Sequence, residues 1–137
     1  MLLKALYATP LREITALLQR EGEGHRRWFT SPTADLFVWL KPGRLDSFEF
    51  CYDKPRREKS VRWSAEQGLR FFRIDDGEDS PLHNRTPIAW PAQDVDRETA
   101  ALRFESLGAG IEAPVYRFVL GRIWLGEPKV PEPEAKR

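Results

Sequence analysis

A basic segment, residues 54–62, has side chains that could bind phosphate groups. Its cationic residues are Lys54, Arg56, Arg57, Lys59 and Arg62. Glu58 is the one acid among them, and Trp63 follows directly. Cations beside an aromatic ring suit nucleic acid, since cations bind phosphates and the ring can stack on bases. The alternative is a solvated hairpin loop, which we favour because the net charge of the whole chain is only +1.

An acidic segment, residues 75–79, could hold a hard cation or move protons. Its carboxylates are Asp75, Asp76, Glu78 and Asp79, and His83 follows four residues later. Such a set would suit a hydrolase-type enzyme that uses general acid–base chemistry. The spacing does not match an EF-hand, which needs acids at alternate positions and a closing Glu. We therefore favour a solvated turn, or an ion pairing with the basic segment. The sequence predicts no metal and no cofactor.

Nucleophilic catalysis has few candidates. Cys51 is the single cysteine, so no intrachain disulfide can form, and it lies between Phe50 and Tyr52. This position indicates a buried, inert thiol, because a reactive thiolate needs polar and cationic neighbours. His25 lies between Gly24 and Arg26 and is expected at the surface. There is no G-x-S-x-G, glycine-rich phosphate loop, C-x-x-C or H-E-x-x-H motif, so we assign no catalytic residue.

These segments flank the strands of a predicted antiparallel meander over residues 34–75. Turn residues close each of its four apolar runs, and three of the runs alternate between apolar and other positions. In the second run Phe48, Phe50 and Tyr52 share one face, which is the period of a half-buried strand. The first run is apolar on both faces, with Phe37 and Trp39 opposite the leucines and valine, so it should lie centrally in the sheet.

Further elements are predicted on either side of the meander. Thr9 and Pro10 suit the start of a helix over residues 10–20. Residues 25–30 could form an edge strand, where their arginines would discourage sheet-to-sheet pairing. Residues 87–91 are too rich in proline for a central strand, and we expect Ile88 and Trp90 to pack on the core.

Two more helices are predicted in the last third of the chain. One begins near Asp94 or Asp96 and ends at Gly108. Another begins at Pro114 and would place Val115, Phe118, Val119 and Ile123 on one face. A strand over residues 115–120 is the alternative, because VYRFVL is rich in residues that favour strands.

The sequence therefore predicts an α+β fold: an antiparallel β-meander of four or five strands, with two or three helices packed on one face. Residues 1–126 would form a single globular domain, and the proline-rich residues 127–137 a disordered tail. The start of the chain does not resemble a signal peptide, and no apolar run approaches the roughly 20 residues that span a bilayer. We expect a cytoplasmic protein that does not associate with membranes.

The aromatic content favours binding over catalysis. Aromatic residues make up 12% of the chain and include five tryptophans. If helices cover one face of the sheet, the other could remain an open aromatic face, which would mark a ligand groove or a dimer interface. The leading hypothesis is a non-enzymatic binding or protein-interaction module that uses this face, with a protein, a small ligand or a second copy as partner. Nucleic-acid binding and the hydrolase-type enzyme are the alternatives.

Residues 28–88 resemble a family of small bacterial proteins. The segments that carry the resemblance are DLFVW, FEFCYDK, Trp63, RIDDGE and NRTPI. In that family a tyrosine–aspartate–lysine segment follows an aromatic strand, and a DDGE segment precedes one like NRTPI. No activity or catalytic residue is assigned to the family, so the resemblance implies a bacterial protein but no function.

Overall fold

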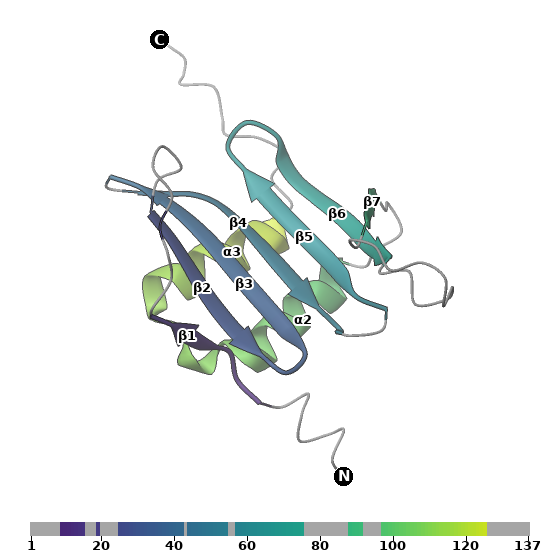
Figure 1. The fold of residues 1–137 in the computed structure, drawn as a ribbon. Coiled ribbons are helices and arrows are strands. Elements are labelled where there is room, and N and C mark those ends of the chain that lie inside the picture. Colours follow the sequence, from purple (N-terminus) through teal and green to yellow (C-terminus); the bar gives the residue numbers. More distant parts are fainter. Residues whose placement is uncertain are drawn as a thin grey trace.

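The computed structural model describes residues 9–15, 19, 25–42, 44–54, 57–75, 88–91 and 97–125. Within them one antiparallel sheet holds seven strands, whose spatial order is their order along the chain. The strands are β1 (Arg12–Ile14), β2 (His25–Ser31), β3 (Ala34–Lys41), β4 (Arg44–Tyr52), β5 (Lys59–Ser64), β6 (Gly68–Asp75) and β7 (Ile88–Pro91). Figure 1 shows this sheet in front of the helices.

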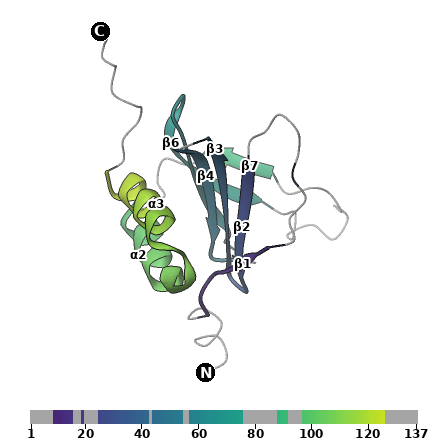
Figure 2. The ribbon, with the colours of Figure 1, turned by 90° about the vertical axis from the view of Figure 1, so that its left-hand side faces the viewer.

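Two α-helices lie on the same face of the sheet. They are α2 (Arg97–Leu107) and α3 (Ala113–Leu125), and the short 3-10 helix η1 (Gly108–Gly110) joins them. An edge-on view shows both helices on one side and none of the described helices on the other (Figure 2). The molecule therefore has an α+β fold of two layers, with one face of the sheet turned away from the helices.

The register explains which side chains meet the helices. Leu36 in β3 lies opposite Phe50 in β4, and Phe50 lies opposite Val61 in β5. Side chains that face each other across antiparallel strands leave the sheet on the same side. All three are fully buried. The alternating pattern in the sequence thus becomes a continuous apolar surface under α2 and α3.

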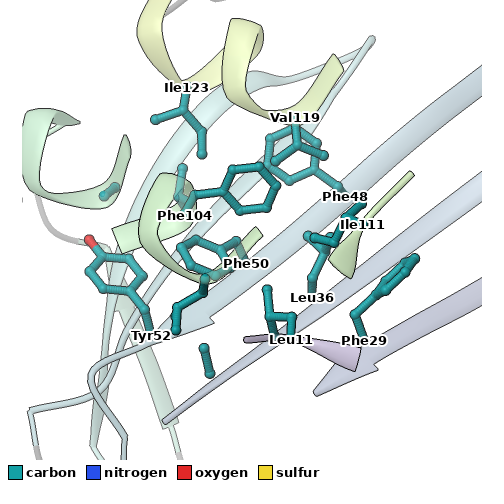
Figure 3. Packing of buried hydrophobic residues seen from close by; sticks show 14 of the residues in the cluster. Leu11, Phe29, Leu36, Phe48, Phe50, Tyr52, Phe104, Ile111, Val119 and Ile123 are labelled. Carbon is teal, nitrogen blue, oxygen red and sulfur yellow. The ribbon is translucent and has the colours of Figure 1, made fainter. Parts of the chain in front are cut away.

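The hydrophobic core fills the space between the sheet and the helices (Figure 3). Phe50 stacks on Tyr52 with ring centroids 5.3 Å apart and meets the edge of Phe104 at the same distance. The α3 residues Val119 and Ile123 are completely buried. Aromatic pairs of this kind add stability beyond the area they bury, so Phe50 connects the sheet to α2.

The N-terminal strand is held to the helical layer by a close backbone contact. The backbone N–H of Leu11 donates to the carbonyl of Leu107 at 2.8 Å, and the Leu11 side chain is buried. A Cβ atom on Gly110 would lie 2.8 Å from the Leu11 carbonyl oxygen. Glycine is therefore required there, because any side chain would push β1 away from η1.

The helix predicted over residues 10–20 is wrong where the structure describes it. Residues 12–14 form β1, with Glu13 opposite Phe29 and Ile14 opposite Trp28. Thr9 and Pro10 favour a helix only through local interactions. Residues distant in the sequence favour the strand instead, because they pair with β1 in the sheet, form the ion pair with Glu13 and bury Leu11. Residues 16–18 and 20 lie outside the described part of the chain.

The additional strands account for the other differences. The meander over residues 34–75 is confirmed as β3 to β6, but the sheet has more than four or five strands because β1, β2 and β7 extend it. Consequently β2 pairs on both sides and is not an edge. At the opposite edge Trp90 in β7 is 55% exposed, so the expectation that it packs on the core was wrong.

The predicted helices of the last third are confirmed in type. α2 ends at Leu107, directly before the expected glycine, and its first described residue is Arg97. The segment from residue 113 is the helix α3 rather than a strand, with Val115, Val119 and Ile123 buried. Its spacing of buried positions is helical, which outweighs the β propensity of the individual residues. The tail predicted over residues 127–137 lies outside the described residues.

A partly exposed ion cluster joins β1, β2 and the residue before α3, and it predicts a pH dependence. Arg27 donates from Nε to Glu13 Oε2 at 2.8 Å and from Nη2 to Glu112 Oε1 at 3.0 Å. The hydrogen bond from Arg27 lowers the pKa of Glu13 and that of Glu112 below their usual range. Stability from these carboxylates is present above their unfolded pKa of about 4.3 and is lost as the pH falls below it.

We expect Arg27→Gln to reduce this acid sensitivity. When the pH falls from about 6 to about 3, the free energy of unfolding should decrease more in the wild type than in the variant. Glu13 should contribute less than about 1 kcal/mol to this decrease, because it is partly exposed. Urea unfolding at both pH values measures the difference. Arg12→Gln, on the exposed neighbouring position of β1, is the matched control. Equal acid sensitivity of wild type and Arg27→Gln would contradict the role of the cluster.

Candidate functional site

The face of the sheet turned away from the helices, the open face, carries one continuous row of chemically distinct side chains. The register aligns one residue from each of five strands: Trp28, Phe37, Glu49, Arg62 and Arg70. We call this the central row. It runs from aromatic residues on β2 and β3, through a carboxylate on β4, to arginines on β5 and β6.

The aromatic half of the open face consists of Trp28, Phe37 and Trp39. Trp28 and Phe37 stack with centroids 5.9 Å apart and planes within 9° of parallel. Trp39 adds a tilted contact with Phe37 at 6.2 Å. All three rings are half-buried, so each still presents part of its surface to solvent. The sequence left open whether this face is exposed or covered, and these three rings lie on the side of the sheet away from α2 and α3.

The arginine half of the open face is built on Phe72. Arg62 and Arg70 lie directly opposite each other, and their guanidinium carbons are 4.2 Å and 5.3 Å from the centre of the Phe72 ring. Arg62 donates from Nε to Glu49 Oε2 at 3.0 Å. In the part of the chain that the structure describes, the buried Nε of Arg70 has no hydrogen-bond partner. The half therefore keeps an excess of positive charge.

Glu49 lies in the middle strand and accepts several hydrogen bonds. Besides Arg62, its Oε2 accepts a hydrogen bond from Ser60 Oγ at 3.1 Å and one from the Cys51 thiol at 3.6 Å. Burial and the charge of Glu49 raise the pKa of the Cys51 thiol. Cys51 is thus a protonated donor, which confirms the expectation of a buried, unreactive thiol.

Asp35 holds the aromatic half in position. Its Oδ1 accepts hydrogen bonds from Trp28 Nε1 at 2.9 Å and from Thr30 Oγ1 at 2.7 Å, and its Oδ2 pairs with Lys54. Burial opposes the charge on Lys54, but the hydrogen bond and charge of Asp35 outweigh it and raise the pKa of Lys54. Because three donors satisfy the hydrogen-bonding capacity of the buried Asp35 carboxylate, this carboxylate holds the Trp28 indole in a fixed position.

The basic segment of the sequence is divided among several environments. Lys54 pairs with Asp35, and Arg62 belongs to the open face. Trp63 is only 4% exposed and packs in the core against Phe118, so it is not available for stacking on a ligand. Arg56 lies outside the described residues. Of the predicted phosphate-binding residues, the structure thus brings Arg57 and Lys59 together.

Arg57 and Lys59 line a pocket of about 380 Å³ where β5 begins and β6 ends, together with Glu58, Arg73 and Ile74. The Lys59 ammonium donates to the Arg57 carbonyl at 3.1 Å and lies 3.6 Å from Asp53 Oδ2. We call this the basic pocket. A smaller pocket of about 240 Å³ lies near it, where Asp53 accepts a hydrogen bond from Arg103 Nε at 2.8 Å.

The acidic segment cannot be assembled into a site from the described residues. Asp75 ends β6, but its side chain lies outside the described part, as do Asp76, Glu78, Asp79 and His83. His25 is exposed at the start of β2, as expected. Among the described residues, no group of three His, Cys, Asp or Glu side chains is placed to hold a metal ion.

Arg70 and Arg73 were not among the predicted site residues, and Trp90 was predicted to be in the core, but the structure places all three at these surfaces. The alternation of Arg70, Phe72 and Ile74 was a usable signal, since it assigns Arg70 to the same face as Phe72. The proximity of Arg73 and Trp90 to the basic pocket could not be found in this way, because it depends on the pairing of β6 with β7.

Comparisons of the chain with protein-family models, with curated proteins and with solved structures found no match. Neither α2 nor α3, the helices that the structure describes, is long and apolar enough to cross a membrane. The geometry of the open face and of the basic pocket is therefore the basis for a proposed function.

Proposed function

We propose that this protein is a non-enzymatic binding module and that its open face binds a second copy of the same chain. The observation that supports this is the division of the open face into an aromatic half and an arginine half on opposite sides of β4. Arginine side chains are attracted to the faces of aromatic rings, especially when both are partly removed from water. The face is thus complementary to itself.

The strand order supports one arrangement for such a dimer. β4 is the middle strand of the seven, with the aromatic half on β2 and β3 and the arginine half on β5 and β6. Two sheets stacked face to face about a two-fold axis parallel to β4 place β3 over β5 and β2 over β6. Phe37 then faces Arg62 of the partner subunit, and Trp28 faces Arg70 of the partner subunit. Symmetry repeats each contact.

A two-fold axis perpendicular to the strands is disfavoured. It would stack arginines on arginines and aromatic rings on aromatic rings. Opposed like charges at an interface cost several kcal/mol, so this arrangement has no electrostatic advantage. The two halves of the open face therefore favour one orientation of a symmetric dimer, with each arginine half over an aromatic half.

Analytical ultracentrifugation of the wild type and of single variants tests the proposal. We expect the wild type to dimerise, and we expect Phe37→Thr and Arg70→Glu each to weaken the dimer at least about tenfold, which corresponds to about 1.4 kcal/mol. Threonine keeps the β propensity of position 37. The matched control is Arg117→Glu, an exposed position on the helical layer. A wild type that stays monomeric at all concentrations would refute the proposal.

Mixing Phe37→Thr with a second variant, Arg62→Gln, tests the orientation, because Phe37 would face Arg62 of the partner subunit. In the heterodimer one contact between these two positions is lost and its symmetry-related copy is intact. Each homodimer of a variant loses both copies of this contact. The heterodimer should therefore be more stable than either variant homodimer, and the opposite order would contradict the arrangement about an axis parallel to β4.

Nucleic-acid binding through residues 54–62 has less support from the geometry. It needs cations beside an accessible aromatic ring, whereas Trp63 is in the core and Arg62 is hydrogen-bonded to Glu49. The hydrolase-type hypothesis rests on side chains outside the described residues, so no observed geometry supports it.

A further inference from the structure

The open face has a second row of aligned side chains next to the central row, and the size of these side chains changes across the sheet. The register aligns one residue from each of the same five strands: Arg26, Trp39, Ser47, Ser64 and Gly68. We call this the second row. Its large side chains lie on β2 and β3, and its small residues lie on β4, β5 and β6. The step in size therefore follows the division between the aromatic half and the arginine half.

Trp39 and Ser64 show this difference in size on the two strands that flank β4. Both residues are half-buried, so part of each side chain still faces solvent. The Trp39 ring contacts Phe37, with ring centroids 6.2 Å apart. The Ser64 hydroxyl accepts a hydrogen bond from the backbone N–H of Gln67 at 3.1 Å, which holds it close to its own turn. Since side chains stand roughly perpendicular to a sheet, the indole extends further from the open face than the serine does.

A face-to-face dimer of two sheets leaves limited space for large side chains. Stacked sheets lie about 10 Å apart, and the side chains of the two inner faces interdigitate within that distance. Large side chains must therefore face small ones if the sheets are to meet without strain or cavities. Two indoles at the same place would hold the sheets apart, and two serines would leave a gap between them.

A two-fold axis parallel to β4 satisfies this requirement. It places β3 over β5 and keeps each row at the same level along the strands, so Trp39 lies over Ser64 of the partner subunit. Symmetry repeats this contact on the other side of the axis. Ser47 lies on the middle strand and meets its own symmetry copy, where two small side chains let the sheets approach each other. An axis perpendicular to the strands would instead place one aromatic half on the other.

We infer that the sizes of residues 39 and 64 determine which chains can pair through the open face. Trp39 packs over Ser64 of the partner subunit, and a chain with a large residue at position 64 is excluded because it overlaps with that indole. This inference rests on the proposed dimer, and it adds the two positions that select a second copy as the partner. Gly68 does not contribute to this argument, because its φ of 74° requires glycine whatever residue faces it.

Sedimentation of variants at position 64 tests the contact by changing the size of one side chain. Ser64→Ala removes the hydroxyl and its hydrogen bond to the turn without adding bulk, so it is the matched control and should dimerise like the wild type. Ser64→Leu should weaken the dimer, and Ser64→Trp should weaken it further, by at least about tenfold relative to the wild type. A monomeric wild type would refute the proposed dimer and this inference with it. Equally tight dimers of the wild type and Ser64→Trp would overturn only the contact between residues 39 and 64.

A mixture of Trp39→Thr with Ser64→Trp tests the pairing directly. Threonine is small and keeps the β propensity of position 39. In each variant homodimer, both copies of the contact pair small with small or large with large. In the heterodimer the introduced indole faces the introduced threonine, and the remaining Trp39 faces the remaining Ser64. The heterodimer should therefore be at least about tenfold tighter than either variant homodimer, as followed by sedimentation with a fluorescent label on one variant. A heterodimer no tighter than the homodimers would overturn the inference.

Discussion

Replacing Phe50 with alanine will lower the free energy of unfolding by about 3–5 kcal/mol. Phe50 is completely buried and contacts Tyr52 within the sheet and Phe104 in α2, with ring centroids 5.3 Å away in both cases. The alanine variant loses the transfer free energy of the ring and leaves a cavity between two layers that cannot collapse freely. Urea unfolding monitored by tryptophan fluorescence measures the change.

A matched substitution at the surface separates burial from hydrophobicity. Leu125 ends α3 and is 68% exposed. Leu125→Ala should therefore change the free energy of unfolding by less than about 0.5 kcal/mol. A cost below about 1 kcal/mol for Phe50→Ala would mean that α2 does not pack on the sheet as described.

Asp35→Ala is expected to cost about 2–4 kcal/mol, the second largest effect. The substitution leaves the Trp28 indole N–H, the Thr30 hydroxyl and the Lys54 ammonium without their common acceptor. Lys54 is partly exposed and can turn to water, so the cost stays below that of a fully buried ion pair. Denaturant unfolding of the variant checks this value.

Asp35→Asn and Lys54→Met distinguish hydrogen bonding from charge. Asparagine keeps an acceptor for Trp28 and Thr30 and should cost about half as much as alanine. The pKa of Lys54 is raised in the folded protein, so its contribution is complete below the unfolded pKa of about 10.4 and is lost as the pH rises beyond it. Lys54→Met should remove that alkaline loss. An Asp35→Asn variant as unstable as Asp35→Ala would show that charge dominates.

The part of the fold that the sequence predicted is the part with strong periodicity. Phe48, Phe50 and Tyr52 alternate with polar or small residues, and this alternation both identifies β4 and assigns the face that meets the helices. The spacing of Val115, Val119 and Ile123 identified α3 in the same way. Where burial follows the period of an element, the sequence carries enough information.

The misassigned elements depend on partners that are distant in the sequence. β1 has only three residues, too few to show a period of two, and it is a strand because β2 pairs with it and Leu11 is buried against Leu107. Trp90 looked like a core residue because it is large and apolar, but it belongs to an edge strand. Propensity and composition contain no information about either contact.

The candidate sites were harder to predict than the fold. The sequence indicated that Arg57 and Lys59 are close together and basic. It did not indicate whether these two residues share a surface with the next basic and aromatic residues of the segment, Arg62 and Trp63, because that depends on the turn before β5. The structure places the first two at a pocket, the third on the open face and the fourth in the core. Alternation within β5 separates neighbours onto opposite faces, so closeness in sequence was misleading.

The order of the strands also has a consequence for how the chain folds as it is synthesised. Because each strand pairs with its neighbour in sequence, every hairpin from β2 to β6 can close as soon as its second strand has left the ribosome. The apolar rows of the sheet, however, are covered by α2 and α3, which are translated after the seven strands that the structure describes. The nascent chain therefore exposes a paired but uncovered sheet, which is the stage at which aggregation competes with folding. Stable folding waits for the last helix, so we expect nascent chains that end before α3 to depend on chaperones for solubility.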